Sequence, residues 1–262
     1  MVRKVRKPSS GLPYVFISLI LSISLPLLYA GYFIINATQN FATDFVSGEY
    51  NTIEEYVLSS LSQGNTVLIV QGLLWVGMLS GPILAAIMKI KLWLDDTKVL
   101  SLGYKNKWLW MGPLLGLAAQ SVLLVFGFLV QQAFPEGEVE GNAGEIIDSF
   151  SGIPIFAIIL MIVVGAPIVE EILYRGLVFT ALSNKIGVLA GAIISSLAFG
   201  LSHVSALTIN GIFTAAITSL FGGLLVYARI KSKGLFLPIL MHMSFNGISA
   251  IAIVVALENG II

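Results

Sequence analysis

The feature that most constrains this chain is a series of apolar runs, each about as long as a helix that crosses a membrane. An α-helix rises about 1.5 Å per residue, so about 20 apolar residues cross the hydrocarbon core of a bilayer. The runs occupy residues 13–36, 66–88, 108–131, 152–174, 186–207, 211–228 and 235–257. The sequence therefore predicts an all-α fold, a polytopic membrane helix bundle of about seven transmembrane helices.

Composition excludes several other classes of protein. The 262 residues are 57% hydrophobic and 11% charged, with a mean hydropathy of +0.95, whereas a soluble domain is about 25% charged. The chain has no cysteine, which excludes disulfides, Cys-ligated metals and a Cys nucleophile. Fourteen basic and fourteen acidic residues give zero net charge, so we expect no nucleic acid as a partner. The hydrophobic composition leads us to expect membrane lipid as a partner.

The basic residues divide the loops into two classes. With a cytoplasmic N-terminus, all fourteen Lys and Arg residues fall in the inner segments 1–12, 89–107, 175–185 and 229–234. None falls in the outer segments 37–65, 132–151, 208–210 and 258–262. Because basic residues in short loops set orientation, the sequence predicts a multi-pass protein of the cell membrane with its N-terminus in the cytoplasm. The first run exceeds the length of a signal peptide's apolar region, so we interpret it as a retained helix.

A shift in composition near residue 151 predicts two regions. Residues 1–151 form an N-terminal membrane region of three helices with an unknown accessory role. Residues 152–262 form a helical core. Five ionisable residues lie inside its apolar runs or at their ends, namely Glu170, Glu171, Arg175, His203 and His242. An ionisable group at membrane depth costs roughly 2.5–3.5 kcal/mol on insertion scales and is functional by default.

The first ionisable cluster contains two adjacent glutamates. Glu171 and Arg175 are four residues apart and can pair along one helix face. Glu170 is rotated by about 100° from Glu171 on a helix and does not share that partner. We therefore expect Glu171 and Arg175 to be structural and Glu170 to face a water-filled cavity as a general base.

Two further clusters each place a histidine one helical turn from a second notable residue. Phe199 precedes His203 by four residues, so its ring should shield the imidazole. His242 precedes Asn246 by the same spacing. A single histidine in a membrane helix is as well explained as a hydrogen-bond partner between helices. The three clusters together contain two His, a Glu and an Asn, and this combination favours a functional site.

Helix geometry allows the clusters to meet. A turn at 184–187 would join the fourth and fifth helices; Glu170 lies 15 residues before Lys185 and His203 lies 18 after it. In an antiparallel pair this mismatch is about 4–5 Å, which side chains can bridge. The fourth helix must then continue past Arg175 toward Leu182. The sequence predicts one site that opens toward the cytoplasm.

The residue types in this site favour hydrolysis of a peptide bond without a covalent intermediate. A carboxylate helped by an imidazole can take a proton from water and pass it to a leaving amine, and N–H groups can stabilise the oxyanion. The chain has no His-Glu-x-x-His and no Gly-x-Ser-x-Gly motif. We favour a site without a cofactor; the alternative is a zinc ion bound by Glu170, His203 and His242.

The three clusters also carry a resemblance to a known family. Glu-Glu-x-x-x-Arg at 170–175, Phe-x-x-x-His at 199–203 and His-x-x-x-Asn at 242–246 resemble the motifs of the CAAX prenyl protease and bacteriocin-processing (CPBP) family. The resemblance covers residues 152–257 and implies an intramembrane protease of the glutamic type. It also implies a peptide or protein substrate, whether lipidated or not, and its bacterial branch is linked to bacteriocin immunity.

The resemblance assigns a role to each motif residue. It implies that Glu170 activates water with His203 as its partner, and that His242 and Asn246 form the oxyanion site. Glu171 and Arg175 would brace the helix.

Two non-proteolytic functions use the same residues. A membrane immunity or binding factor, or a small proton-coupled transporter, could also bury Glu and His side chains. The two halves of the chain share no pattern of broken helices, which disfavours an inverted-repeat transporter. A transporter should fail when the proton gradient collapses, and a binding factor should protect cells even as Glu170→Gln.

The orientation can be tested in this cysteine-free chain. We expect Tyr50→Cys and Glu140→Cys to react with a membrane-impermeant thiol reagent added outside intact cells, because both positions lie in acidic outer segments. Asp95→Cys should react only after the membrane is permeabilised. Labelling of position 95 in intact cells would invert the topology.

Overall fold

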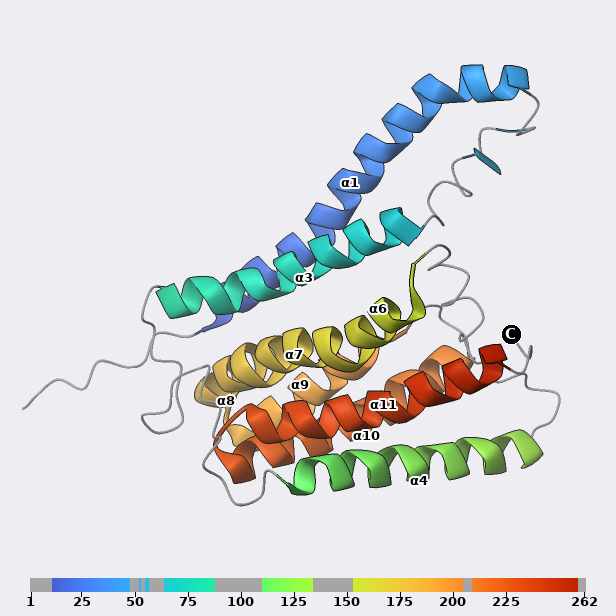
Figure 1. Ribbon diagram of the computed structural model, residues 1–262. Coiled ribbons are helices and arrows are strands. Elements are labelled where there is room, and N and C mark those ends of the chain that lie inside the picture. Colours follow the sequence, from blue (N-terminus) through green and yellow to red (C-terminus); the bar gives the residue numbers. More distant parts are fainter. Residues whose placement is uncertain are drawn as a thin grey trace, which may run out of the picture.

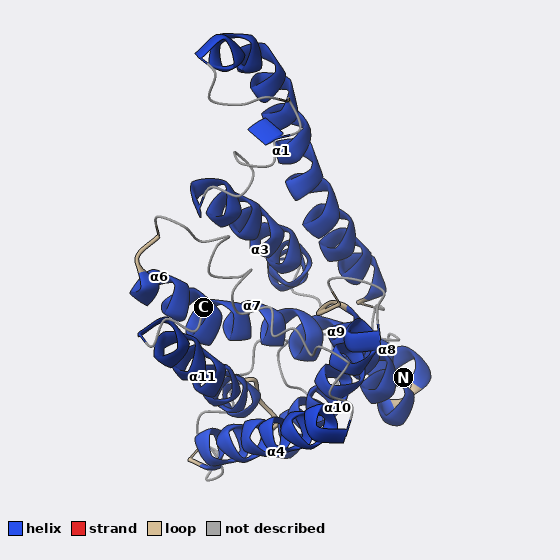
Figure 2. Ribbon diagram, turned by 90° about the vertical axis from the view of Figure 1, so that its right-hand side faces the viewer, coloured by secondary structure: helices blue, strands red, loops and turns tan. Residues whose placement is uncertain are grey.

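The computed structural model describes residues 11–47, 52, 55–56, 64–87, 110–133, 153–204 and 209–258. Within these residues the regular structure is helical, which confirms the predicted fold class (Figures 1 and 2). Three helices precede the core: α1 (Leu12–Ser47), α3 (Gly64–Ile87) and α4 (Met111–Ala133). Three more close the described chain: α9 (Val188–Leu201), α10 (Ile209–Ser232) and α11 (Phe236–Glu258).

Between these groups runs one long helical segment over residues 155–186, interrupted by two wider π-helical turns. Its successive parts are α6 (Ile155–Leu160), η1 (Met161–Gly165), α7 (Ala166–Glu171), η2 (Ile172–Val178) and α8 (Phe179–Ile186). This segment carries the two adjacent glutamates on the short helix α7.

Helix length and side-chain exposure indicate a membrane protein. Four spans are long and apolar enough to cross a bilayer, namely Leu12–Asn36, Asn65–Ile87, Ile155–Ile186 and Gly211–Ser232. Three shorter apolar helices, Met111–Val125, Val188–Leu201 and Phe236–Ala252, complete the expected seven. Large apolar side chains such as Leu28, Leu189 and Leu220 face outward, as lipid contact requires.

The orientation in the membrane stays a prediction. The basic residues of 1–7 and 89–107 and the acidic residues of 136–148, on which it depends, lie outside the described residues. The division at residue 151 is likewise a prediction from composition.

Helices α1, α3, α9, α10 and α11 pack against the long segment (Figures 1 and 2). The pair α1 and α3 lies on one side of the bundle, and α4 lies on the opposite side against α11. Helix α9 packs between α8 and α10. The core contains Leu177, Phe199, Phe221 and Leu225, so it is centred where the long segment, α9 and α10 meet.

The predicted hairpin after Arg175 is confirmed, with one difference at its far end. The long segment continues to Ile186, and Gly187 turns the chain with φ of 90°, a conformation that glycine adopts readily. Helix α9 ends at Leu201, whereas the apolar run extends to residue 207. The Ser202 hydroxyl and the His203 ring both bond the Phe199 carbonyl, and such side-chain bonds compete with continued helix. His203 therefore sits in a turn.

Helices α1 and α3 approach each other closely over small residues. The Ser18 hydroxyl donates to the Met78 carbonyl and accepts from the Gly81 N–H, each at 3.0 Å. A Cβ at Gly77 would overlap the backbone of Ser22, and one at Gly81 would overlap the Tyr14 carbonyl. This contact depends on backbone proximity, as in other small-residue membrane interfaces.

The same helix offers a matched control for this interface. We expect Gly77→Ala and Gly81→Ala to lower the melting temperature in detergent, because overpacking costs about 1–3 kcal/mol. Gly72→Ala should leave it nearly unchanged, because no atom lies within 4 Å of a Cβ there. Equal melting temperatures for all three variants would contradict the close packing of α1 on α3.

Candidate active site

The predicted pair of Glu171 and Arg175 lies at the centre of the site and is fully buried. Arg175 Nη1 is 2.8 Å from Glu171 Oε1, and both side chains are 0% exposed. Arg175 Nη2 donates to the Gly222 carbonyl of α10 at 3.2 Å. The guanidinium carbon lies 4.2 Å from the centre of the Phe199 ring of α9, within cation–π range. One cation thus connects three helical segments.

His242 of α11 uses the same carboxylate oxygen as Arg175. Its Nδ1 lies 3.0 Å from Glu171 Oε1. Because an ionised carboxylate only accepts hydrogen bonds, we assign the proton to Nδ1. The rings of Phe199 and Phe221 stand edge-on to the imidazole, with centroids at 5.6 and 5.5 Å. Glu171 therefore orients His242, much as the acid of a catalytic triad orients its histidine.

His203 is oriented by its own turn. Its Nδ1 lies 2.7 Å from the Phe199 carbonyl, which can only accept, so Nδ1 again carries the proton. The Phe199 ring packs 4.6 Å from the imidazole, as the spacing of the two residues predicts. The free Nε2 is left to face the site.

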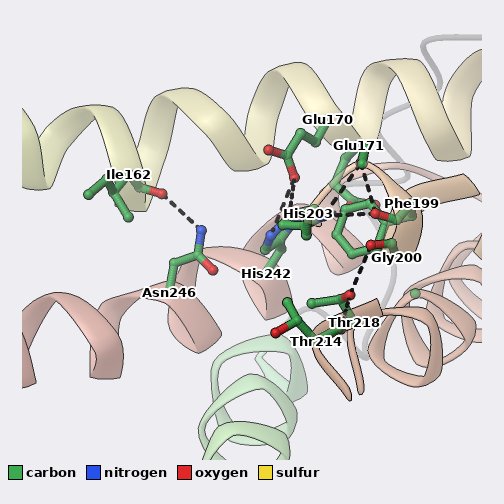
Figure 3. A network of polar contacts seen from close by, with 12 residues as sticks. Ile162, Glu170, Glu171, Phe199, Gly200, His203, Thr214, Thr218, His242 and Asn246 are labelled. Carbon is green, nitrogen blue, oxygen red and sulfur yellow. Dashed lines mark hydrogen bonds and ion pairs between the residues drawn. The ribbon is translucent and has the colours of Figure 1, made fainter. Parts of the chain in front are cut away.

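Glu170 lies where the two imidazoles converge (Figure 3). Its Oε2 is 3.8 Å from Nε2 of His203 and 3.8 Å from Nε2 of His242. That oxygen is buried and has no direct hydrogen bond. A separation beyond 3.5 Å between polar atoms is one that a water molecule can bridge. The structure thus brings together three of the four predicted catalytic side chains around one point.

Asn246 is engaged elsewhere. It lies one turn after His242 on α11, and its Nδ2 donates to the carbonyl of Ile162 at 2.9 Å (Figure 3). Ile162 belongs to the π-helical turn η1 that precedes Glu170. The oxyanion role that the resemblance assigns to Asn246 stays a prediction.

Two residues of α10 contribute to the site and were missed by the sequence analysis. Phe221 stacks on Phe245 at 3.9 Å between centroids while standing edge-on to His242. Gly222 supplies the carbonyl for Arg175, and a Cβ there would lie 3.2 Å from the Phe199 ring. The pair of glycines at 222 and 223 within an apolar run is the signal that indicates such close packing.

The donor set has the chemistry of a zinc site. Two imidazole nitrogens and a carboxylate are zinc ligands, and metal-bound histidines usually donate their second N–H to an acceptor, as His203 and His242 do here. The positions of these three side chains fit a zinc ion less well than their chemistry does. Among the described residues, no group of three or more His, Cys, Asp or Glu side chains is placed so that it could hold a metal ion.

Comparisons with known proteins agree with the motifs. Residues 152–248 match the family model described as type II CAAX prenyl endopeptidase Rce1-like. A Bacillus subtilis (strain 168) protein named "Putative membrane peptidase YdiL" is 28% identical over 146 residues, covering 56% of this chain and 55% of that protein. An Escherichia coli protein named "Uncharacterized 24.3 kDa protein" is 36% identical over 87 residues, covering 32% of this chain and 39% of that protein.

These matches define how far the similarity reaches. The chain spans about half the length of the first relative and less of the second. No solved structure matches it significantly. The matched family segment contains all three motifs and every residue of the site described above. Over residues 152–248 this chain is therefore similar to the Rce1-like family of type II CAAX prenyl endopeptidases.

Proposed function

We propose that this protein is a membrane endopeptidase that hydrolyses a peptide bond with a water molecule activated by Glu170 and His203. The observation that carries the proposal is the convergence of Glu170 Oε2 with two imidazole Nε2 atoms at 3.8 Å each. The name of the Bacillus relative includes "membrane peptidase", which supports a peptide or protein as the substrate.

The hydrogen-bonding capacity of a water molecule at this point constrains the protonation of the site. Water donates two hydrogen bonds, so only two of the three surrounding atoms can accept from it. We assign the acceptors to Glu170 Oε2 and His203 Nε2. We assign the third atom, His242 Nε2, as a donor to the water; because His242 Nδ1 also donates to Glu171, this assignment makes His242 an imidazolium ion.

Charge balance supports this assignment. Glu171 and Arg175 neutralise each other in the buried pair, and Glu170 leaves one negative charge. An imidazolium at His242 compensates it, because an unpaired charge in an apolar interior is costly. The site then contains equal numbers of positive and negative groups.

The proposed reaction follows from these positions. Glu170 takes a proton from the water as the oxygen attacks the scissile carbonyl carbon, and it passes the proton to the leaving amine when the C–N bond breaks. The His242 Nε2–H donates to the oxyanion of the tetrahedral intermediate. Glu170 and His203 are 17% and 32% exposed, whereas His242 is 4% exposed, so the substrate approaches from the side of Glu170 and His203.

Adjacent isosteric substitutions separate catalysis from bracing. We expect Glu170→Gln to abolish cleavage with a smaller loss of melting temperature than Glu171→Gln, because Glu170 Oε2 has no direct hydrogen bond to lose. We expect His203→Ala to be inactive as well. Glu171→Gln should be destabilised by about 3–5 kcal/mol, because it leaves Arg175 buried without its counter-ion. Mass spectrometry of a candidate peptide and thermal unfolding in detergent measure the two effects.

The variants Glu170→Gln and Glu171→Gln would also reveal the reverse assignment, in which Glu171 is the general base and Glu170 is structural. A stable but inactive Glu171→Gln beside an active Glu170→Gln would move the base to Glu171. A Glu170→Gln variant that keeps full cleavage would end the proposed mechanism.

The role of a metal ion needs its own experiment. We propose that the reaction proceeds without a metal, so enzyme treated with a membrane-permeant chelator and repurified should keep its turnover. Elemental analysis of the same sample confirms that it is free of metal. Loss of turnover that stoichiometric zinc restores would replace this mechanism with one in which Glu170, His203 and His242 bind zinc.

A further inference from the structure

The helix that carries Glu170 contains a proline at a position where the backbone needs a donor. In the π-helical turn η1 each N–H bonds the carbonyl five residues earlier, and the Ala166 N–H bonds the Met161 carbonyl in this way. The next bond in that pattern would join the N–H of residue 167 to the Ile162 carbonyl. Pro167 has no N–H, so Ile162 loses its donor within the helix.

Asn246 supplies the missing donor from another helix. Its Nδ2 lies 2.9 Å from the Ile162 carbonyl oxygen, and an unsatisfied backbone carbonyl is strongly disfavoured in an apolar membrane interior. The same turn is also covered by α3, because a Cβ at Gly165 would overlap the Trp75 indole. The turn is therefore held by two helices outside the segment that contains it.

The hydrogen bond from Asn246 to the Ile162 carbonyl, called the bridge below, has residues of the site close to both of its ends. Ile162 lies eight residues before Glu170 on the long segment, and Asn246 lies four residues after His242 on α11. Together with the contact of His242 and Glu171 at 3.0 Å, it joins the two helices at two points. Two points fix both the rotation and the sliding of one helix against the other.

We propose that Asn246 is a positioning residue, which replaces the N–H that Pro167 lacks and thereby holds Glu170 at its distance from His242. Its effect on turnover rests on the proposed function, whereas its effect on the turn does not. The alternative is that Asn246 acts on the oxyanion through its second Nδ2 hydrogen. Only the positioning role depends on Pro167.

A double-mutant cycle with Pro167→Ala separates the two roles. This substitution restores a backbone N–H that can reach the Ile162 carbonyl, so the carbonyl no longer needs Asn246. Asn246→Ala alone should lower the melting temperature by several degrees and speed amide hydrogen exchange in peptides spanning 160–171. It should also lower kcat by about 10²-fold with little change in KM. In the Pro167→Ala background the same substitution should change each quantity only slightly.

Ser249→Ala is the matched control. It removes another interhelical hydrogen bond of α11, the 2.9 Å bond from Gln120 Nε2 to Ser249 Oγ, which does not involve the turn. Its effect on the melting temperature should be the same in the natural chain and in the Pro167→Ala background. Coupling of Ser249→Ala to Pro167→Ala as strong as that of Asn246→Ala would show a general loosening of α11 and would overturn the proposal.

The remaining outcomes are also decisive. An equal loss of kcat in both backgrounds, with unchanged melting temperature and exchange, would make Asn246 an oxyanion donor and overturn the positioning role. If no peptide is cleaved by any variant, the proposed function fails while melting temperature and exchange still test the bridge. If Pro167→Ala does not fold, Asn246→Leu in the natural background replaces it, because leucine has nearly the shape of asparagine and no hydrogen-bond donor for the Ile162 carbonyl. Faster exchange over 160–171 then supports the bridge, and unchanged exchange overturns it.

Discussion

The burial of one arginine determines how the helices of the core are arranged. A guanidinium cannot lose its proton in a protein, so a fully buried Arg175 must be surrounded by groups that compensate its charge. The structure supplies a carboxylate from its own helix, a carbonyl from α10 and an aromatic face from α9. The same carboxylate oxygen then accepts from His242 of α11. Satisfying one cation therefore sets the relative positions of four helical segments, including those that carry the proposed catalytic side chains.

This arrangement gives two adjacent glutamates different electrostatic surroundings. Residues next to each other on a helix point about 100° apart, so Glu171 faces the buried cation while Glu170 faces the partly open side of the bundle. Glu171 is 0% exposed and Glu170 is 17% exposed. A buried ion pair is weak evidence for stability in itself. Its value here is that it engages Arg175 with Glu171 and leaves Glu170 Oε2 without a direct hydrogen bond, so this oxygen is available to exchange a proton with water.

The sequence was informative wherever the relevant contact was local. The spacings of Glu171 with Arg175 and of Phe199 with His203 predicted contacts that the structure shows, and turn residues located the hairpin at Gly187. The partners that depend on the rotation of one helix against another were not predictable: His242 with Glu171, Asn246 with Ile162, and Phe221 with His242. In a membrane bundle the lipid-facing and core-facing sides are both apolar, so hydropathy does not show which side of a helix meets its neighbour.

Asn246 shows why a polar residue near a membrane site is hard to interpret from sequence. The turns η1 and η2 bound α7 on both sides, so the two glutamates lie on a short α-helical piece between wider turns, a type of irregularity that is frequent at functional sites. Each such irregularity frees backbone groups, and in a bilayer these groups must be satisfied by the protein itself. A side chain that satisfies the backbone and one that contacts a substrate can have the same residue type at the same spacing. Only the position of a backbone defect such as Pro167, relative to the side chain, tells the two uses apart.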